Sequence, residues 1–172
     1  MQTTQITPKI YVACLAAYNN GKLHGKWIDA DQEPDAIHEE IQEMLKSSPE
    51  PMAEEWAIHD YEGFEGLSIS EYESIEDVAR FAQLIEEHGE AFSAYAGHIG
   101  TDYATEEGFQ EAYQGKWDSE EAYGENLMDE TMEIPEHLQF YIDYEKFARD
   151  LFINDYFSVD SDDYKVHVFL HI

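Results

Sequence analysis

The sequence predicts an α+β protein made of three small modules, in the order mixed, helical, mixed. Segments rich in β-branched and aromatic residues lie near both ends of the chain, and helical spacing of apolar residues dominates the middle. The predicted modules are an antiparallel sheet with a helix at 1–66, an acidic helical bundle at 67–134, and a mixed helix and β-hairpin at 135–172. Residues 1–8 are expected to form a frayed tail.

The N-terminal module is expected to contain a hairpin, a helix and a third strand. The run Lys-Ile-Tyr-Val-Ala-Cys-Leu at 9–15 favours a strand, and an Asn-Asn-Gly turn separates it from a second strand at 23–28. Apolar residues at i, i+4, i+7 and i+8 predict a helix that follows Pro34 and stops at Ser47. Residues 56–59 are typical of another strand.

The central module is expected to be helical throughout. Ser74 has the character of a helix N-cap, because an acid follows three residues later and an apolar helical face begins at the next residue. Further helices are predicted at 91–98, 105–113 and 119–132, separated by glycines.

The C-terminal module contains both helix and strand patterns. Its sequence predicts a helix over 144–152 and a final hairpin in which 156–160 pairs with 164–170.

Charge is the most unusual property of the chain. The net charge is −30, and residues 54–136 hold 24 Asp and Glu against only Arg80 and Lys116. The mutual repulsion of these charges opposes folding into a compact state. The net charge is also larger than solubility requires. The acidity excludes bare nucleic acid and anionic membranes as partners, since both bind through Lys and Arg. A strongly basic partner is therefore expected.

Acids recur at helical spacing within the predicted helix 119–132. Asp118, Glu121, Glu125, Asp129 and Glu133 would stack on one face about 5–6 Å apart, which resembles the separation of phosphates along a nucleic-acid strand. Rows of this kind can imitate a DNA backbone, whereas the plainer alternative is a solvated acidic face. The candidate mimic carboxylates are Glu62, Glu65, Glu71, Glu73, Glu76, Asp77, Glu86, Glu87, Glu90, Asp102, Glu106, Glu107, Glu111, Asp118, Glu120, Glu121, Glu125, Asp129, Glu130 and Glu133.

The sequence contains no pattern that indicates catalysis or metal binding. Cys14 is the only cysteine, which rules out an internal disulfide. His167 and His171 share a strand face without the further ligands of a zinc site, and glycine motifs that cradle phosphate are absent. We expect no catalytic residue, metal or cofactor. Without a secretory signal or a long apolar segment, the expected location is the cytoplasm.

Three segments resemble the ArdA-type antirestriction proteins. They are Tyr-Val-Ala-Cys-Leu-Ala-Ala-Tyr-Asn-Asn-Gly at 11–21 with Leu-His-Gly-Lys-Trp-Ile at 23–28, Glu-Trp-Ala-Ile-His-Asp-Tyr-Glu-Gly at 55–63, and Ile-Asp-Tyr-Glu-Lys-Phe-Ala-Arg-Asp-Leu at 142–151. The likeness spans roughly 9–170. Cys14 departs from it, since relatives are expected to carry an acidic or polar residue there.

The resemblance implies an elongated homodimer, encoded on mobile elements such as conjugative plasmids, that mimics bent B-form DNA. It implies occupation of the DNA groove of type I restriction-modification enzymes, without turnover. The resemblance also marks an antirestriction segment or dimer contact, whose apolar positions equally fit ordinary helix packing. Its residues are Tyr144, Phe147, Ala148, Arg149, Asp150 and Leu151. Two other classes stay open from the residues alone: an acidic chaperone for basic proteins and a halophilic domain.

Overall fold

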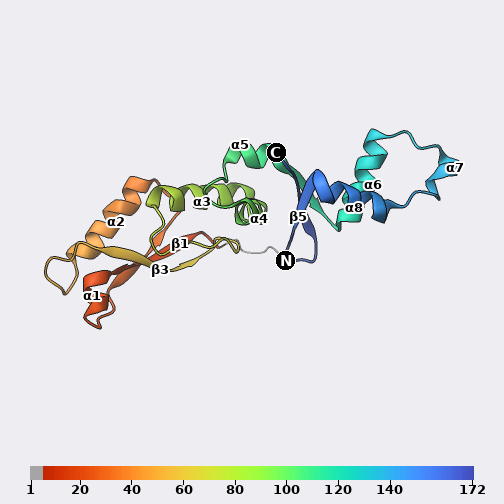
Figure 1. Ribbon diagram of the computed structural model, residues 1–172. Coiled ribbons are helices and arrows are strands. Elements are labelled where there is room, and N and C mark those ends of the chain that lie inside the picture. The colour runs from red at the N-terminus through yellow and green to blue at the C-terminus, as the bar shows by residue number, and fades with distance from the viewer. Residues whose placement is uncertain (1–5) are drawn as a thin grey trace. The chain divides into compact units, whose positions relative to one another are not determined.

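The structure, a computed structural model, describes residues 6–172 and divides into two compact units. The first runs to Ser93 and the second covers Ala94–Ile172, and helices and antiparallel strands occur in both (Figure 1). The predicted α+β class is therefore confirmed, whereas the division at 66 and 134 stays a prediction. None of the described helices is long and apolar enough to cross a membrane.

The first unit contains a sheet of three antiparallel strands. They are β1 (Lys9–Cys14), β2 (Gly25–Asp29) and β3 (Trp56–Glu62), in the order β2-β1-β3. The predicted hairpin and third strand are thus confirmed, with a short helix, α1 (Leu15–Asn19), added between β1 and β2. Residues 1–5 of the predicted tail lie outside the described residues. Pro8 is buried, and its carbonyl accepts a hydrogen bond from the Ala30 N–H at 2.8 Å.

Two helices with apolar faces complete this core. Helix α2 (Pro34–Lys46) contacts β1, β2 and α3 (Ile75–His88), as predicted from its apolar spacing. The predicted cap is confirmed, because the Ser74 hydroxyl accepts a hydrogen bond from the Asp77 N–H at 3.1 Å. Helix α4 (Glu90–Ile99) begins in this unit, where the buried Ser93 hydroxyl donates to the Phe64 carbonyl at 3.0 Å.

The second unit contains another antiparallel sheet. Its strands are β4 (Tyr113–Trp117), β5 (Tyr156–Asp160) and β6 (Val166–Leu170), in the order β4-β6-β5. The predicted final hairpin is confirmed. The prediction that 67–134 is helical throughout is wrong at β4, because α5 ends at Ala112 and Tyr113 pairs with Phe169 of β6. This pairing joins residues far apart in the sequence, so local spacing gave no sign of it.

The helices of the second unit are α5 (Glu106–Ala112), α6 (Glu120–Thr131), α7 (Glu136–Gln139) and α8 (Tyr144–Asn154). The predictions at 105–113, 119–132 and 144–152 hold apart from their ends. Helix α6 packs against α8, and Gly124 of α6 lies close to Ala148 of α8. The fully buried Phe169 ring lies within 5.0–6.4 Å of four other aromatic rings, those of Tyr95, Phe109, Tyr113 and Phe157.

We predict opposite effects for two glycine substitutions within helices of this unit. A Cβ at Gly124 would lie 3.1 Å from the Ala148 Cβ and 3.3 Å from its Cα, whereas a Cβ at Gly97 of α4 meets nothing within 4 Å. Gly124→Leu should lower the free energy of unfolding by about 1–3 kcal/mol through overpacking. Gly97→Leu should raise it by about 0.5–1 kcal/mol through helix propensity. Urea unfolding measures both, and equal effects would contradict the close α6–α8 contact.

Candidate functional site

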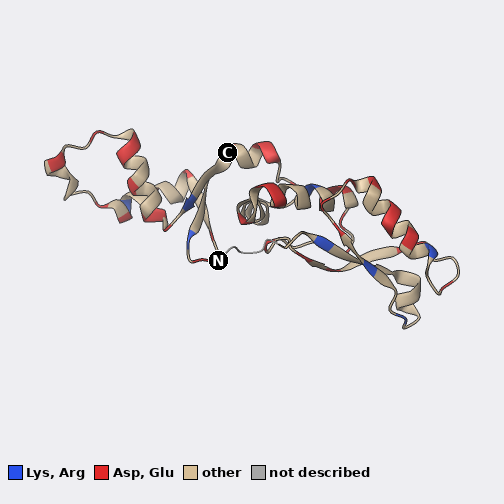
Figure 2. Ribbon diagram, turned by 180° about the vertical axis from the view of Figure 1, so that it is seen from behind, with Lys and Arg blue, Asp and Glu red and all other residues tan. Residues whose placement is uncertain are grey.

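All the candidate mimic carboxylates reach solvent. Glu73, Asp77, Glu90 and Glu120 are half-buried, and the others are exposed. Acids recur along the helices and loops of both units, whereas segments with Lys or Arg are few (Figure 2). The acids are therefore placed on the surface of a packed fold, where a partner can reach them.

Most of the few bases are already engaged by acids of the chain. At least seven of the nine Lys and Arg form ion pairs within residues 6–172. Three of these pairs involve candidate mimic carboxylates: Lys9 with Glu62 at 3.2 Å, Arg80 with Asp77 at 2.9 Å, and Lys165 with Asp118 at 3.1 Å. Sequence reasoning missed the Lys165 pair, because its members lie on segments that only the folded sheet brings together.

The predicted acidic row on α6 is shorter than expected. Glu121, Glu125 and Asp129 lie in the helix at spacings of four, all exposed and without an ion pair to any described residue. Asp118 precedes the Ser119 cap and pairs with Lys165, and Glu133 follows the helix end. The five-residue row is therefore corrected to three residues. Each like-charged neighbour pair opposes helix formation by a few tenths of a kcal/mol.

The buried face of α6 fixes where this row points. Tyr123, Gly124 and Met128 are buried, so residues 121, 125 and 129 are held on another side of the helix. The row also influences its neighbour on α8: burial, together with the charges of Asp129 and Glu125, raises the pKa of the Tyr144 hydroxyl. Three carboxylates thus stay at fixed spacing on a helix that packing holds rigid.

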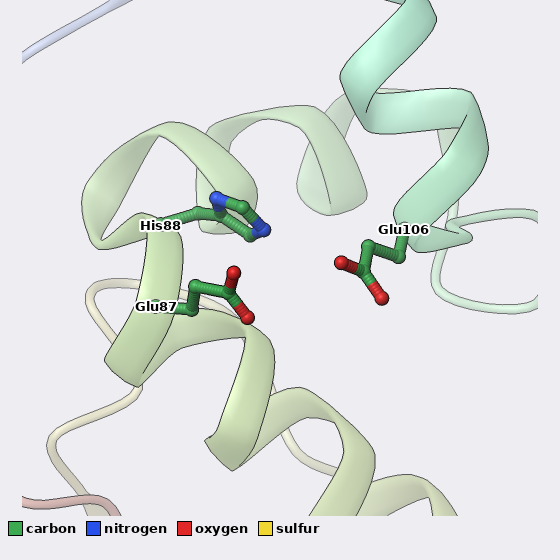
Figure 3. A group of neighbouring side chains, drawn as sticks. All are labelled: Glu87, His88 and Glu106. Carbon is green, nitrogen blue, oxygen red and sulfur yellow. The ribbon is translucent and has the colours of Figure 1, made fainter.

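Acids also lie at helix ends, where the helix dipole stabilises them at the first turn and destabilises them at the last. Glu106 and Glu107 occupy the first turn of α5, where the helix dipole favours negative charge. Glu86 and Glu87 lie in the last turn of α3 beside His88, at the end that disfavours acids. Figure 3 shows the side chains of Glu87 and His88 on α3 and of Glu106 on α5. Helix stability therefore explains the acids of α5 but not Glu86 and Glu87.

The segment marked by the resemblance forms most of α8. Ala148 is buried against α6, while Tyr144, Phe147 and Leu151 are half-buried. Arg149 and Asp150 are exposed, and Arg149 pairs with Glu145 at 3.3 Å. The apolar stripe thus takes part in packing within the chain, and the two charged residues face solvent.

Asp77 differs from the other candidates because it belongs to the α3 cap. The Ser74 hydroxyl donates to its carboxylate at 2.7 Å and Arg80 donates at 2.9 Å. These two hydrogen bonds, with Ser74 the larger influence, lower the pKa of Asp77 from its ordinary 3.8. Its ionised form therefore stabilises the folded state.

We predict that Asp77→Asn lowers the free energy of unfolding at pH 7 by about 0.5 kcal/mol, a modest value because the group is partly exposed. A lowered folded pKa means that the contribution is complete above the ordinary value of 3.8 and is lost as pH falls through the folded pKa. Chemical unfolding of both proteins between pH 7 and pH 2 measures this. A difference that grows at low pH would contradict the assignment.

The sequence of the chain matches one family model. It describes the antirestriction protein (ArdA) family and matches residues 10–166 of the 172. The matched span runs from β1 into β6, so it includes the central acidic stretch and α8. The resemblance noted in the sequence is therefore confirmed at the level of the family. No curated protein sequence matches the chain.

Proposed function

We propose that this chain, which belongs to the ArdA family of antirestriction proteins, occupies the DNA-binding groove of a type I restriction-modification enzyme in place of DNA. Binding would protect incoming mobile DNA by stoichiometric competition, without catalysis. The observation that carries the proposal is the surplus of exposed carboxylates in a chain whose Lys and Arg are mostly engaged in ion pairs.

The spacing of these carboxylates supports DNA mimicry in particular. Residues 121, 125 and 129 recur every four positions on α6, so neighbouring side chains are about 5–6 Å apart. Duplex DNA places one charge per about 1.7 Å of its axis over both strands. Rows of this kind lying side by side would supply a comparable density of fixed anions. A groove built to bind phosphates through Lys and Arg would accept them.

A mimic of this kind should associate rapidly and depend on salt. Electrostatic steering raises association rates by about 10–1,000-fold, and screening by salt removes much of that gain. Because the carboxylates are fixed by folded helices, binding requires little ordering of the inhibitor. The proposal includes a homodimer acting in the cytoplasm, as the resemblance implies, with α8 as the antirestriction segment or dimer contact.

We predict that the purified chain displaces duplex DNA from a type I enzyme, and that its inhibition weakens steeply as salt rises. Fluorescence anisotropy of labelled DNA over a series of NaCl concentrations measures this. An excess of protein that leaves DNA bound at low salt would overturn the proposal. Equally tight binding to unrelated basic proteins would support an acidic chaperone, and loss of fold at low salt together with catalytic turnover would support a halophilic enzyme.

The α6 row allows a sharper test. Glu121→Gln, Glu125→Gln and Asp129→Asn together should weaken inhibition severalfold. Relief of repulsion should offset the loss of Glu121 from the first turn of α6, so the free energy of unfolding should change by less than about 0.5 kcal/mol. Any one of the three changes alone should matter little, because screened contacts share the energy.

The matched control for this triple variant lies on α2. Asp35, Glu39 and Glu43 are exposed, have the same spacing of four, and lie outside the central acidic stretch. Asp35→Asn, Glu39→Gln and Glu43→Gln together remove the same charge and should reduce inhibition much less. Equal loss from both triple variants would show that total charge, and not the row on α6, determines inhibition.

A further inference from the structure

We infer that the first unit contains a receptor for a single guanidinium group, formed by a hollow beside the outer edge of β3. Six residues line it: Tyr18, Ile58, His59, Tyr61, Ile69 and Glu71. Its volume is about 420 Å³, within the range of small-ligand pockets. The identification of its ligand as an Arg side chain of the target enzyme rests on the proposed function.

A β-bulge on β3 lies at the hollow. Along the pairing of β1 with β3, Tyr11 lies opposite Asp60 and Val12 opposite Ile58, so His59 is an additional residue without a partner on β1. A bulge of this kind redirects side chains from their regular alternation. On the outer edge of β3, the Ile58 N–H donates to the Glu71 carbonyl at 2.9 Å, which fixes the segment carrying Glu71 alongside the strand.

The lining of the hollow combines exposed aromatic rings with buried aliphatic side chains. The Tyr18 ring lies edge-on to the His59 ring, with centroids 4.7 Å apart and planes at 79°. Tyr18 is 53% exposed and Tyr61 is 36% exposed, whereas Ile58 and Ile69 are buried. Two tyrosine rings of the lining thus stay open to solvent beside buried apolar side chains, and the negative faces of such rings attract planar cations.

One carboxylate gives the hollow its charge. A Glu71 Oε lies 3.7 Å from the His59 Nε2, and the Glu71 side chain is 51% exposed, so it can accept hydrogen bonds from an incoming donor. The neighbouring Asp60 carboxylate accepts the Tyr61 N–H at 2.8 Å, which holds a second negative charge near this edge. Together these charges repel phosphate and carboxylate ligands.

Arg fits this combination better than Lys does. A guanidinium group is planar, stacks on aromatic rings, is weakly hydrated and donates in a fixed fork to a carboxylate. The ammonium group of Lys is compact and strongly hydrated, so it gains less from the rings. Arg side chains are also frequent binding hot spots in protein interfaces. The geometry therefore assigns the hollow to arginine.

An NMR titration of the full chain with the peptide acetyl-Gly-Arg-Gly-amide tests the inference without any enzyme. We expect shifts confined to signals around Tyr18, His59, Tyr61 and Glu71. The same peptide with citrulline, the neutral isostere of arginine, should produce none, and the Lys peptide should bind more weakly. Shifts scattered over many acids, or equal shifts with citrulline, would overturn the assignment.

Matched variants complete the test. Tyr18→Leu and Glu71→Gln should each weaken Arg-peptide binding by about threefold or more. Trp27→Leu on β2, at the opposite edge of this sheet, and Glu39→Gln on α2 remove an exposed ring and an exposed acid elsewhere in this unit, and should leave binding unchanged. Thermal melts verify that all four variants fold. Equal affinities of the four variants for the Arg peptide would contradict the inference.

The DNA competition assay separates this inference from the proposed function. If the chain displaces DNA and the Tyr18 and Glu71 variants displace it equally well, the hollow has no role in the complex and the inference fails alone. If the chain does not displace DNA while the Arg peptide binds locally, the proposed function fails and the guanidinium receptor stands.

Discussion

The whole structure depends on apolar burial that outweighs the mutual repulsion of 39 acids. Both units meet this condition with small but dense cores: Ile10, Val12 and Ile37 are fully buried in the first, and Val168 and Phe169 in the second. The few bases act locally, through ion pairs with nearby acids. Lys116 pairs with Asp163 at 3.0 Å and Lys165 pairs with Asp118, so both pairs join the end of β4 to the turn between β5 and β6. Compaction thus leaves most carboxylates unneutralised.

Helix ends give some of the acids a structural role as well. Thr105, Ser119 and Asp143 each accept a hydrogen bond from a backbone N–H of the following helix, and acids occupy the first turns after them. The helix dipole favours those positions. Acids in the middle of α6 or at the end of α3 receive no such benefit. Helix stability therefore does not account for these acids, whereas the cationic groove of the proposed function would.

Local signals explain which parts of the fold could be predicted from the sequence. Capping residues and apolar spacing act over a few positions, so α2, α3, α6 and α8 were predictable to within their ends. Strand β4 was missed because its partner β6 lies far along the chain and because Gly115, at φ 102°, interrupts any regular pattern. The charge of the candidate site was visible in the sequence, but the ion pairs of its carboxylates depend on tertiary structure. The bulge at His59 beside the hollow depends likewise on the register between β1 and β3.

Charge alone does not explain a long-lived complex, and the hollow beside β3 would supply a contact of another kind. A protein that only imitates phosphates is attracted to a cationic groove as DNA is, and salt screens both attractions alike. Such attraction raises the rate of association more than it lengthens the lifetime of the complex. Residence depends on contacts that exclude water and break slowly. Tyr18, Tyr61 and Glu71 offer an arginine both an aromatic stack and a carboxylate, a combination that a phosphate lacks. An inhibitor with both features would approach like DNA and yet dissociate more slowly than its charge alone allows.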